Sequence, residues 1–203
     1  MKNFLSLVLL FSFLGFSSAV FAQSDKIDLK EINKNRLAFE KKSMYVLGGW
    51  SVANFTYNGA VLLGGVKNGE AKYFYQSNIY WNTINFALAG GGLLFGKRNT
   101  ALNYSQTLKA YHSTQKVLLF NAGIDVGYIM TGLYLRERAK TRTDIKTTNQ
   151  FLGYGKSLIV QGGFLLLFDA STYLLSKRQS DRLYDIPVSL ALAPNHLQFT
   201  YRF

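Results

Sequence analysis

The chain has 203 residues, enough for one domain, and combines 48% hydrophobic residues with only 17% charged ones. Soluble domains contain roughly 25% charged residues, so this balance favours a protein that packs in lipid. The absence of cysteine excludes disulfides, thiolate chemistry and cysteine-ligated zinc. The formal net charge of +12 is compatible with nucleic-acid binding, but the Lys and Arg residues are spread among loops that flank apolar runs. Such loops are typical of contact with lipid headgroups, so we expect no nucleic-acid partner.

The N-terminus has the three parts of a secretory signal peptide. Lys2 supplies the positive charge, "FLSLVLLFSFLGF" the apolar core, and "SAVFAQ" a small-residue cleavage site after Ala22. This pattern predicts a signal peptide at 1–22 and a mature chain that begins at Gln23. An uncleaved anchor helix is the alternative, although the apolar core is short for a membrane span.

A polar segment and four apolar segments follow. Residues 23–43 are polar with scattered Ile, Leu and Phe, which predicts a short amphipathic helix at the membrane surface. Four apolar windows, each about the 20 residues that a helix needs to cross a bilayer, then lie at roughly 44–66, 77–95, 117–135 and 157–175. The sequence therefore predicts an all-α membrane protein. Its core is a four-helix antiparallel transmembrane bundle over 44–175, preceded by the signal peptide and the amphipathic helix.

Residues 176–203 are predicted to form a polar tail that ends in a strand or an extended arm. Alternating Leu197, Phe199, Tyr201 and Phe203 indicate the strand. An outer-membrane barrel also combines a signal peptide with an aromatic C-terminus. Polar residues inside the apolar windows argue against a barrel, because they recur every three or four residues, as on one helix face. These runs are Asn54 and Asn58; Asn78, Asn82 and Asn85; and Asn121, Asp125 and Tyr128.

We expect a multi-pass protein of the bacterial cell membrane, the inner membrane being preferred and the outer membrane remaining an alternative. A cleaved signal peptide places Gln23 outside the cell, so the linkers 67–76 and 136–156 would face the cytoplasm. These linkers contain 8 Lys and Arg residues, whereas the segments predicted to lie outside contain 14. The positive-inside rule prefers the opposite orientation. The two arguments disagree, and the orientation stays open.

The four windows each contribute polar side chains near one depth. Counted at 1.5 Å per residue from the inner end of each span, amides and carboxylates fall within roughly 6 Å of one level. Asp125 and Asp169 are the most unusual members, since an ionised Asp at midspan costs about 3 kcal/mol. Lys156 lies thirteen residues before Asp169 and cannot pair with it along one helix. The residues of this predicted layer are Asp125, Asp169, Asn121, Tyr128, Asn58, Asn85 and Gln161.

Two interpretations of the layer compete. In the first, hydrogen bonds between helices fix their register at about 0.6–2 kcal/mol each. In the second, the layer is a site for a proton, an ion or a small ligand, with Asp125 and Asp169 as its central residues. The glycines at 123 and 127, together with Gly162 and Gly163, predict close packing of backbones.

The sequence has no catalytic signature, so we expect no enzyme, cofactor or metal site. "GYGKS" at 153–157 resembles the end of a phosphate-binding loop, but Gln150 stands where the first Gly is required and no buried strand precedes it. His112 and His196 have no partners at metal-ligand spacing. No G-x-S-x-G nucleophile motif is present.

Three stretches of the chain resemble a family of uncharacterised bacterial membrane proteins, in which a signal peptide precedes four spans. They are "LLFNAGIDVGYIMTGLYLRER" at 118–138, "LGYGKSLIVQGGFLLLFDASTYL" at 152–174 and, more weakly, "YWNTINFALAGGGLL" at 80–94. The resemblance implies a fold and a membrane setting and brings no activity with it. It makes motif members, without assigned roles, of Asn121, Asp125, Tyr128, Gly155, Gln161 and Asp169.

The first functional hypothesis is a non-enzymatic membrane component that assembles with itself or with a membrane partner through its polar termini and small-residue faces. The second is a small transporter, channel or proton-linked carrier that uses Asp125 and Asp169. An intramembrane enzyme ranks third, because no nucleophile and base are placed together. In every case the lipid bilayer is the expected surrounding.

Overall fold

A computed structural model describes residues 28–96, 98–184, 189–193 and 196–200. The predicted signal peptide at 1–22 lies outside the described residues. The chain divides into two compact units, one comprising Asp28–Asp185 and the other the two terminal segments. The first contains four helices: α2 (Leu29–Leu63), α3 (Gly69–Phe95), α4 (Tyr104–Ala139) and α5 (Ile145–Asp181). The second contains strands β1 (Ser189–Ala193) and β2 (His196–Thr200).

Each helix begins directly after an Asp or Asn that caps its first turn. The side chain of Asp28 accepts a hydrogen bond from the Lys30 amide at 2.9 Å, and that of Asn68 accepts one from the Ala71 amide at 3.0 Å. Asn103 exchanges such bonds with Gln106, and Asp144 accepts from Thr147. The caps satisfy amides that have no partner inside the helix. Hydrogen bonds from Thr147 also hold the pKa of Asp144 below its usual value.

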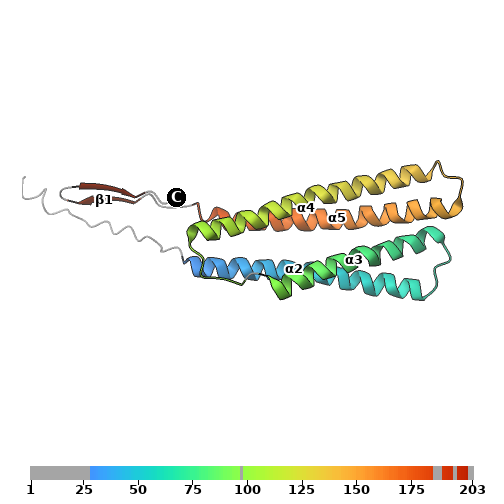
Figure 1. Ribbon diagram of the computed structural model, residues 1–203, viewed down its shortest axis with the longest axis horizontal. Helices are drawn as coiled ribbons and strands as arrows, with labels where there is room; N and C mark the ends of the chain where they lie inside the picture. The colour runs from blue at the N-terminus through green and yellow to red at the C-terminus, as the bar shows by residue number, and fades with distance from the viewer. Residues whose placement is uncertain (1–27, 97, 185–188, 194–195, 201–203) are drawn as a thin grey trace, which may run out of the picture. The chain divides into compact units, whose positions relative to one another are not determined.

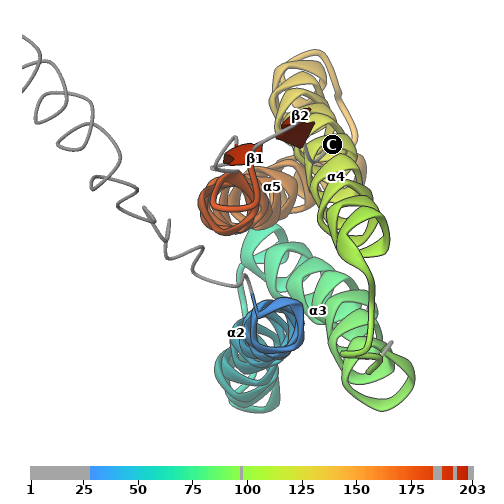
Figure 2. The same cartoon turned by 90° about the vertical axis from the view of Figure 1, so that its left-hand side faces the viewer.

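Successive helices run antiparallel, with the α2–α3 and α4–α5 loops at the same end of the bundle (Figure 1). The helix α3 packs against both α2 and α5, and α4 packs mainly against α5. Seen along the bundle, α3 lies between α2 and α5 (Figure 2). This arrangement leaves a cavity between the helices, and side chains from all four of them line it.

The structure corrects the predicted surface helix at 23–43. Its described part is the beginning of α2, which continues without a break to Leu63. No Gly or Pro interrupts residues 29–47, so nothing ends the helix at residue 43. One face of this part is buried: Asn33 donates to Thr107 Oγ1 at 2.7 Å, and Arg36 is ion-paired with Glu40.

The described helices extend beyond the predicted apolar windows. Those windows are uncharged apart from their two acids, whereas charged turns at the start of α3 and at both ends of α4 and α5 are also helical. By length and composition, α4 and α5 are able to cross a membrane. α2 and α3 do not meet that criterion, since amides lower the mean hydropathy of their apolar windows.

Close packing of α4 against α5 depends on Gly162, which the sequence predicted, and on Gly155, which it did not. A Cβ added at Gly155 would lie 2.7 Å from the Gly132 carbonyl oxygen, and one at Gly162 would lie 2.9 Å from the Asp125 carbonyl oxygen. Only glycine allows the two backbones to come so close. In contrast, Cβ atoms at Gly123 and Gly127 would meet nothing within 4 Å, so these two residues do not pack inside the chain.

In the second unit, β1 and β2 pair antiparallel, with Ser189 opposite Thr200 and Ala193 opposite His196. The strand β2 contains two of the four alternating residues that indicate a strand, Leu197 and Phe199. The other two, at 201 and 203, lie outside the described residues. The first part of the predicted tail, residues 176–181, belongs to α5.

Candidate functional site

The interior of the helical unit is polar. Of its described residues, seventeen polar or charged ones are buried and only seven hydrophobic ones. Proteins that are surrounded by water have the opposite balance, with mostly hydrophobic residues in their interiors. The buried polar side chains therefore need hydrogen-bond partners, and many of them belong to two groups.

The first group, which we call the amide network, joins α2, α3 and α5. Its centre is Asn78 on α3, whose Oδ1 accepts hydrogen bonds from Ser157 Oγ at 2.8 Å and Gln161 Nε2 at 2.9 Å. Asn78 Nδ2 donates to Asn58 Oδ1 at 3.3 Å, and Gln161 Nε2 also lies 3.3 Å from Asn54 Oδ1. These bonds satisfy buried amides from three helices at once, which fixes the register of the helices.

Trp50 extends the amide network, a role that the sequence does not indicate. Its indole nitrogen donates to Gln161 Oε1 at 3.1 Å, and its ring stacks on Phe164 with centroids 3.9 Å apart. From the sequence alone, a Trp near the end of an apolar window indicates an anchor at the membrane interface. A Trp that bonds to a neighbouring helix can have the same position in the sequence. Only the partner on α5 distinguishes them.

The second group surrounds a cavity of about 460 Å³, which we call the acid cavity. All four helices line it. Asp125 and Asp169 face it from α4 and α5, and Asn85 faces it from α3. Asn121 and Tyr128, one turn of α4 to either side of Asp125, also line it. Its other walls are mostly apolar.

The two carboxyl groups are buried and interact directly with each other. Asp125 is 3% exposed and Asp169 is 5% exposed. Each carboxyl lies within hydrogen-bonding reach of the other. Lys156, which directly precedes the apolar window that contains Asp169, instead forms an ion pair with Glu70 on α3. No Lys or Arg is among the described residues that line the acid cavity.

The predicted polar layer is thus divided in the structure. Five of its seven members line the acid cavity, and the other two, Asn58 and Gln161, belong to the amide network. The depth argument brought Asn58, Asn85, Asp125 and Asp169 near one level, with Gln161 below them, but contained no information on which helices are neighbours. Because α3 lies between α2 and α5, their amides meet there, away from α4.

Several residues around the acid cavity were missed by reasoning from the sequence. Trp81 on α3 lies against Tyr128 with ring centroids 4.6 Å apart, and both line the cavity. Glu40 on α2 lines it too, because the segment taken for a surface helix packs inside the unit. The helical spacing of Trp81 and Asn85, four residues apart, is the one sequence signal that could have indicated this face.

The "GYGKS" stretch has no role in phosphate binding in this fold. It lies inside α5, where Gly153 packs on the α3 backbone and Gly155 on α4. Among the described residues no group of three or more His, Asp or Glu side chains is arranged to hold a metal ion. The His112 ring nitrogen Nε2 lies 2.7 Å from the Tyr184 hydroxyl.

Comparison with known proteins connects this chain to one family. Residues 46–170 match the family of unknown function DUF6992, so the chain belongs to that family. The match covers about half of α2, most of α5 and the whole of α3 and α4, including the amide network, Asp125 and Asp169. Neither a curated protein nor a solved structure is significantly similar to the chain.

Proposed function

We propose that this member of the DUF6992 family is an integral membrane protein whose four helices all cross the bilayer. It serves as a non-enzymatic membrane component that assembles with itself or with a membrane partner. The observation that supports this proposal is the inverted polarity of the helical unit, which buries amides and carboxylates and exposes large apolar side chains. Lipid is the solvent in which that arrangement is stable.

Apolar side chains are exposed on every helix of the unit. Tyr57 on α2, Tyr80 on α3, Phe120 on α4 and Leu167 on α5 are each more than half exposed. Soluble monomers rarely present contiguous apolar surface on this scale. Exposure on all four helices, including α2 and α3, supports a lipid-facing role for each of them.

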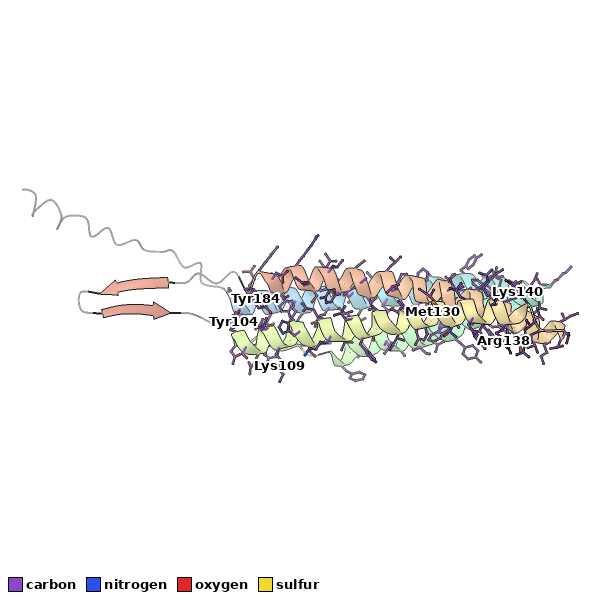
Figure 3. All side chains as sticks on the ribbon, turned by 90° about the horizontal axis from the view of Figure 1, so that it is seen from above. Tyr104, Lys109, Met130, Arg138, Lys140 and Tyr184 are labelled. Carbon is purple, nitrogen blue, oxygen red and sulfur yellow. The ribbon has the colours of Figure 1, made fainter. Side chains whose placement is uncertain are left out.

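Basic residues delimit the apolar part of each helix. Between them run 19 to 24 residues, and the only charged residues within these stretches are Asp125 and Asp169. At 1.5 Å per residue the stretches are about 30 Å or more in length, the thickness of a bilayer's hydrocarbon core. Figure 3 shows the pattern on α4, where Lys109 lies toward one end, Met130 between, and Arg138 toward the other end. The delimiting pairs are Lys42 and Lys67, Lys72 and Lys97, Lys116 and Arg136, and Lys156 and Lys177.

Single cysteines introduced into this naturally cysteine-free chain test the topology. Because the sequence predicts a signal peptide, we propose the bacterial inner membrane as the location in which this topology is tested. Lys67→Cys and Arg142→Cys lie in the two loops at one end of the unit, and Asn99→Cys lies in the loop at the other end. A membrane-impermeant maleimide applied to intact cells should label either the first two or the third. Labelling of all three from one side, or a protein soluble without detergent, would contradict four spans.

Assembly is supported by a face of α4 that has no partner among the residues that the structure describes. Large apolar side chains and two glycines without close neighbours follow one another on this face at alternating spacings of three and four residues. That is the spacing of a helix–helix seam, and small residues in it allow close approach in membranes. We call this face the α4 seam; it consists of Phe120, Gly123, Gly127, Met130 and Tyr134.

A second candidate function, a small transporter, channel or proton-linked carrier, is favoured by the acid cavity. Carboxylates buried between membrane helices are typical of ion and proton pathways. Asp125→Asn should then abolish a proton or cation flux into vesicles that contain the purified protein, while insertion into the vesicles is unchanged. Equal flux for the variant and the wild type, or no flux for either, would contradict the carrier function. The non-enzymatic membrane component would then remain as the proposed function.

A further inference from the structure

The acid cavity has an unbalanced negative charge. Three acidic residues line it, but Glu40 is balanced by Arg36, whose Nη1 lies 2.8 Å from Glu40 Oε1. Thr114 also donates to that oxygen at 3.1 Å. Asp125 and Asp169 have no basic neighbour among the described residues that line the cavity. A buried carboxylate without a cation is strongly disfavoured, so this end of the cavity is suited to a positive group.

Two buried polar atoms beside the cavity have no hydrogen-bond partner. They are Oδ2 of Asp125 and Nδ2 of Asn85, and both residues are only 3% exposed. Buried polar groups in folded proteins are nearly always paired, and an orphaned one costs about 1–3 kcal/mol. The free acceptor on the buried Asp125 carboxyl indicates that a hydrogen-bond donor or a positive group is missing there.

The proximity of the Asp125 and Asp169 carboxyl groups determines how much positive charge a ligand needs to balance them. Two like charges buried at one cavity repel each other, which favours a single negative charge on the pair over two. A divalent metal would need a larger set of oxygen ligands, whereas one positive charge balances this pair.

Aromatic rings beside the carboxyl pair favour an organic cation over an inorganic one. Trp81 and Tyr128 lie against each other at the cavity, and Phe168 lines it one residue before Asp169. The faces of such rings attract ammonium-type cations, most strongly away from water. Leu47, Leu118 and other aliphatic side chains complete walls suited to an apolar body.

We propose that the acid cavity binds an organic monocation, an amine or quaternary centre attached to an apolar body. Its charge lies beside Asp125 and Asp169 and against the Trp81–Tyr128 pair. The volume of about 460 Å³ is within the range of roughly 300–1,000 Å³ found for small-molecule sites. The biological use of this binding rests on the carrier function proposed above, but binding itself requires no transport.

Equilibrium binding of tetraphenylphosphonium to the full-length protein in detergent tests the proposal. This probe is a permanent monocation with an apolar body, and tetraphenylborate is an anion of the same shape. Wild-type protein should bind the cation saturably, with one site per chain, and bind the anion at least tenfold more weakly. Asp125→Asn and Asp169→Asn should each weaken the binding of the cation at least tenfold. Equal affinity for the cation and the anion would overturn the proposal and assign the cavity to a lipid chain.

Asp181→Asn is the matched control, since it removes the same charge from α5 outside the cavity, where Asp181 pairs with Lys177 at 2.9 Å. Its affinity for the phosphonium should equal that of the wild type. Undiminished binding by both cavity variants would contradict the proposal. Binding in detergent without flux in vesicles would remove the carrier function alone, and flux without phosphonium binding would remove this inference alone.

Wild-type protein offers a second measurement in case the variants do not fold. Dicyclohexylcarbodiimide, an apolar reagent, labels protonated carboxyl groups in apolar surroundings, and peptide mass spectrometry locates the label. Saturating tetraphenylphosphonium should slow the labelling of Asp125 or Asp169 at least severalfold. Labelling that proceeds at both residues at the same rate with and without the cation would overturn the proposal.

Discussion

At the scale of single residues, Asn78 joins three helices. Its side chain accepts hydrogen bonds from Ser157 and Gln161 on α5 and donates one to Asn58 on α2. The helical spacing of Asn78, Asn82 and Asn85 predicted one polar face on this helix, and all three are buried. Spacing alone could not reveal that Asn78 and Asn85 face different helices, because that depends on how the helices pack.

Replacing Asn78 by Leu should lower the free energy of unfolding by about 2–4 kcal/mol. The substitution removes three hydrogen bonds between helices and leaves Ser157 and Gln161 short of partners in an interior without water. Denaturation of the purified protein in mild detergent, followed by circular dichroism, measures the change. Thr83→Val on the same helix is the control, since the exposed Thr83 bonds only to its own helix, at the Ile79 carbonyl. Equal stability of the two variants would show that the amide network contributes nothing.

At the scale of helices, the boundaries and the close contacts differ in how far the sequence predicts them. Helix starts were readable in principle, because Asp28, Asn68, Asn103 and Asp144 each precede a helix as caps. Apolar windows underestimate helix length, since the charged turns at their ends are helical as well. The contacts of glycines were not readable. Gly123 and Gly127 have the spacing of a packing motif, yet α4 meets α5 through Gly132.

Two alanine substitutions on α5 should therefore have opposite effects. Gly155→Ala places a methyl group 2.7 Å from the Gly132 carbonyl oxygen, which belongs to a backbone that cannot turn aside. It should destabilise the protein by about 1–3 kcal/mol. Gly163→Ala, where nothing lies within 4 Å, should be neutral or stabilising by up to about 1 kcal/mol through its higher helix propensity. Thermal unfolding of both variants in one detergent makes the comparison, and a similar loss in both would contradict the α4–α5 contact.

At the scale of the whole molecule, the distribution of polar and apolar residues along the sequence predicted the helices but not which of their faces are buried. Four long helices follow from the apolar windows and from the three- and four-residue spacing of polar residues within them. The burial of the segment before residue 44 could not be predicted, because Asn33 and Arg36 look like surface residues until Thr107 and Glu40 are seen beside them. In a unit with a polar interior, polar residues no longer indicate the outside. The apolar α4 seam is then the face that remains for association.

A second copy of the chain is the partner for which the α4 seam is best suited. Glycines that are exposed and free of contacts allow two α4 helices to approach closely, and Phe120, Met130 and Tyr134 would cover the crossing. Gly127→Leu should weaken self-association in lipid at least tenfold, because its side chain keeps the helices apart. Single-molecule photobleaching of labelled protein across a range of lipid dilutions measures this. Gly59→Leu adds the same bulk to α2, where no neighbour lies within 4 Å, and should associate as the wild type does. A wild-type chain that is monomeric at every dilution would show that the seam faces only lipid.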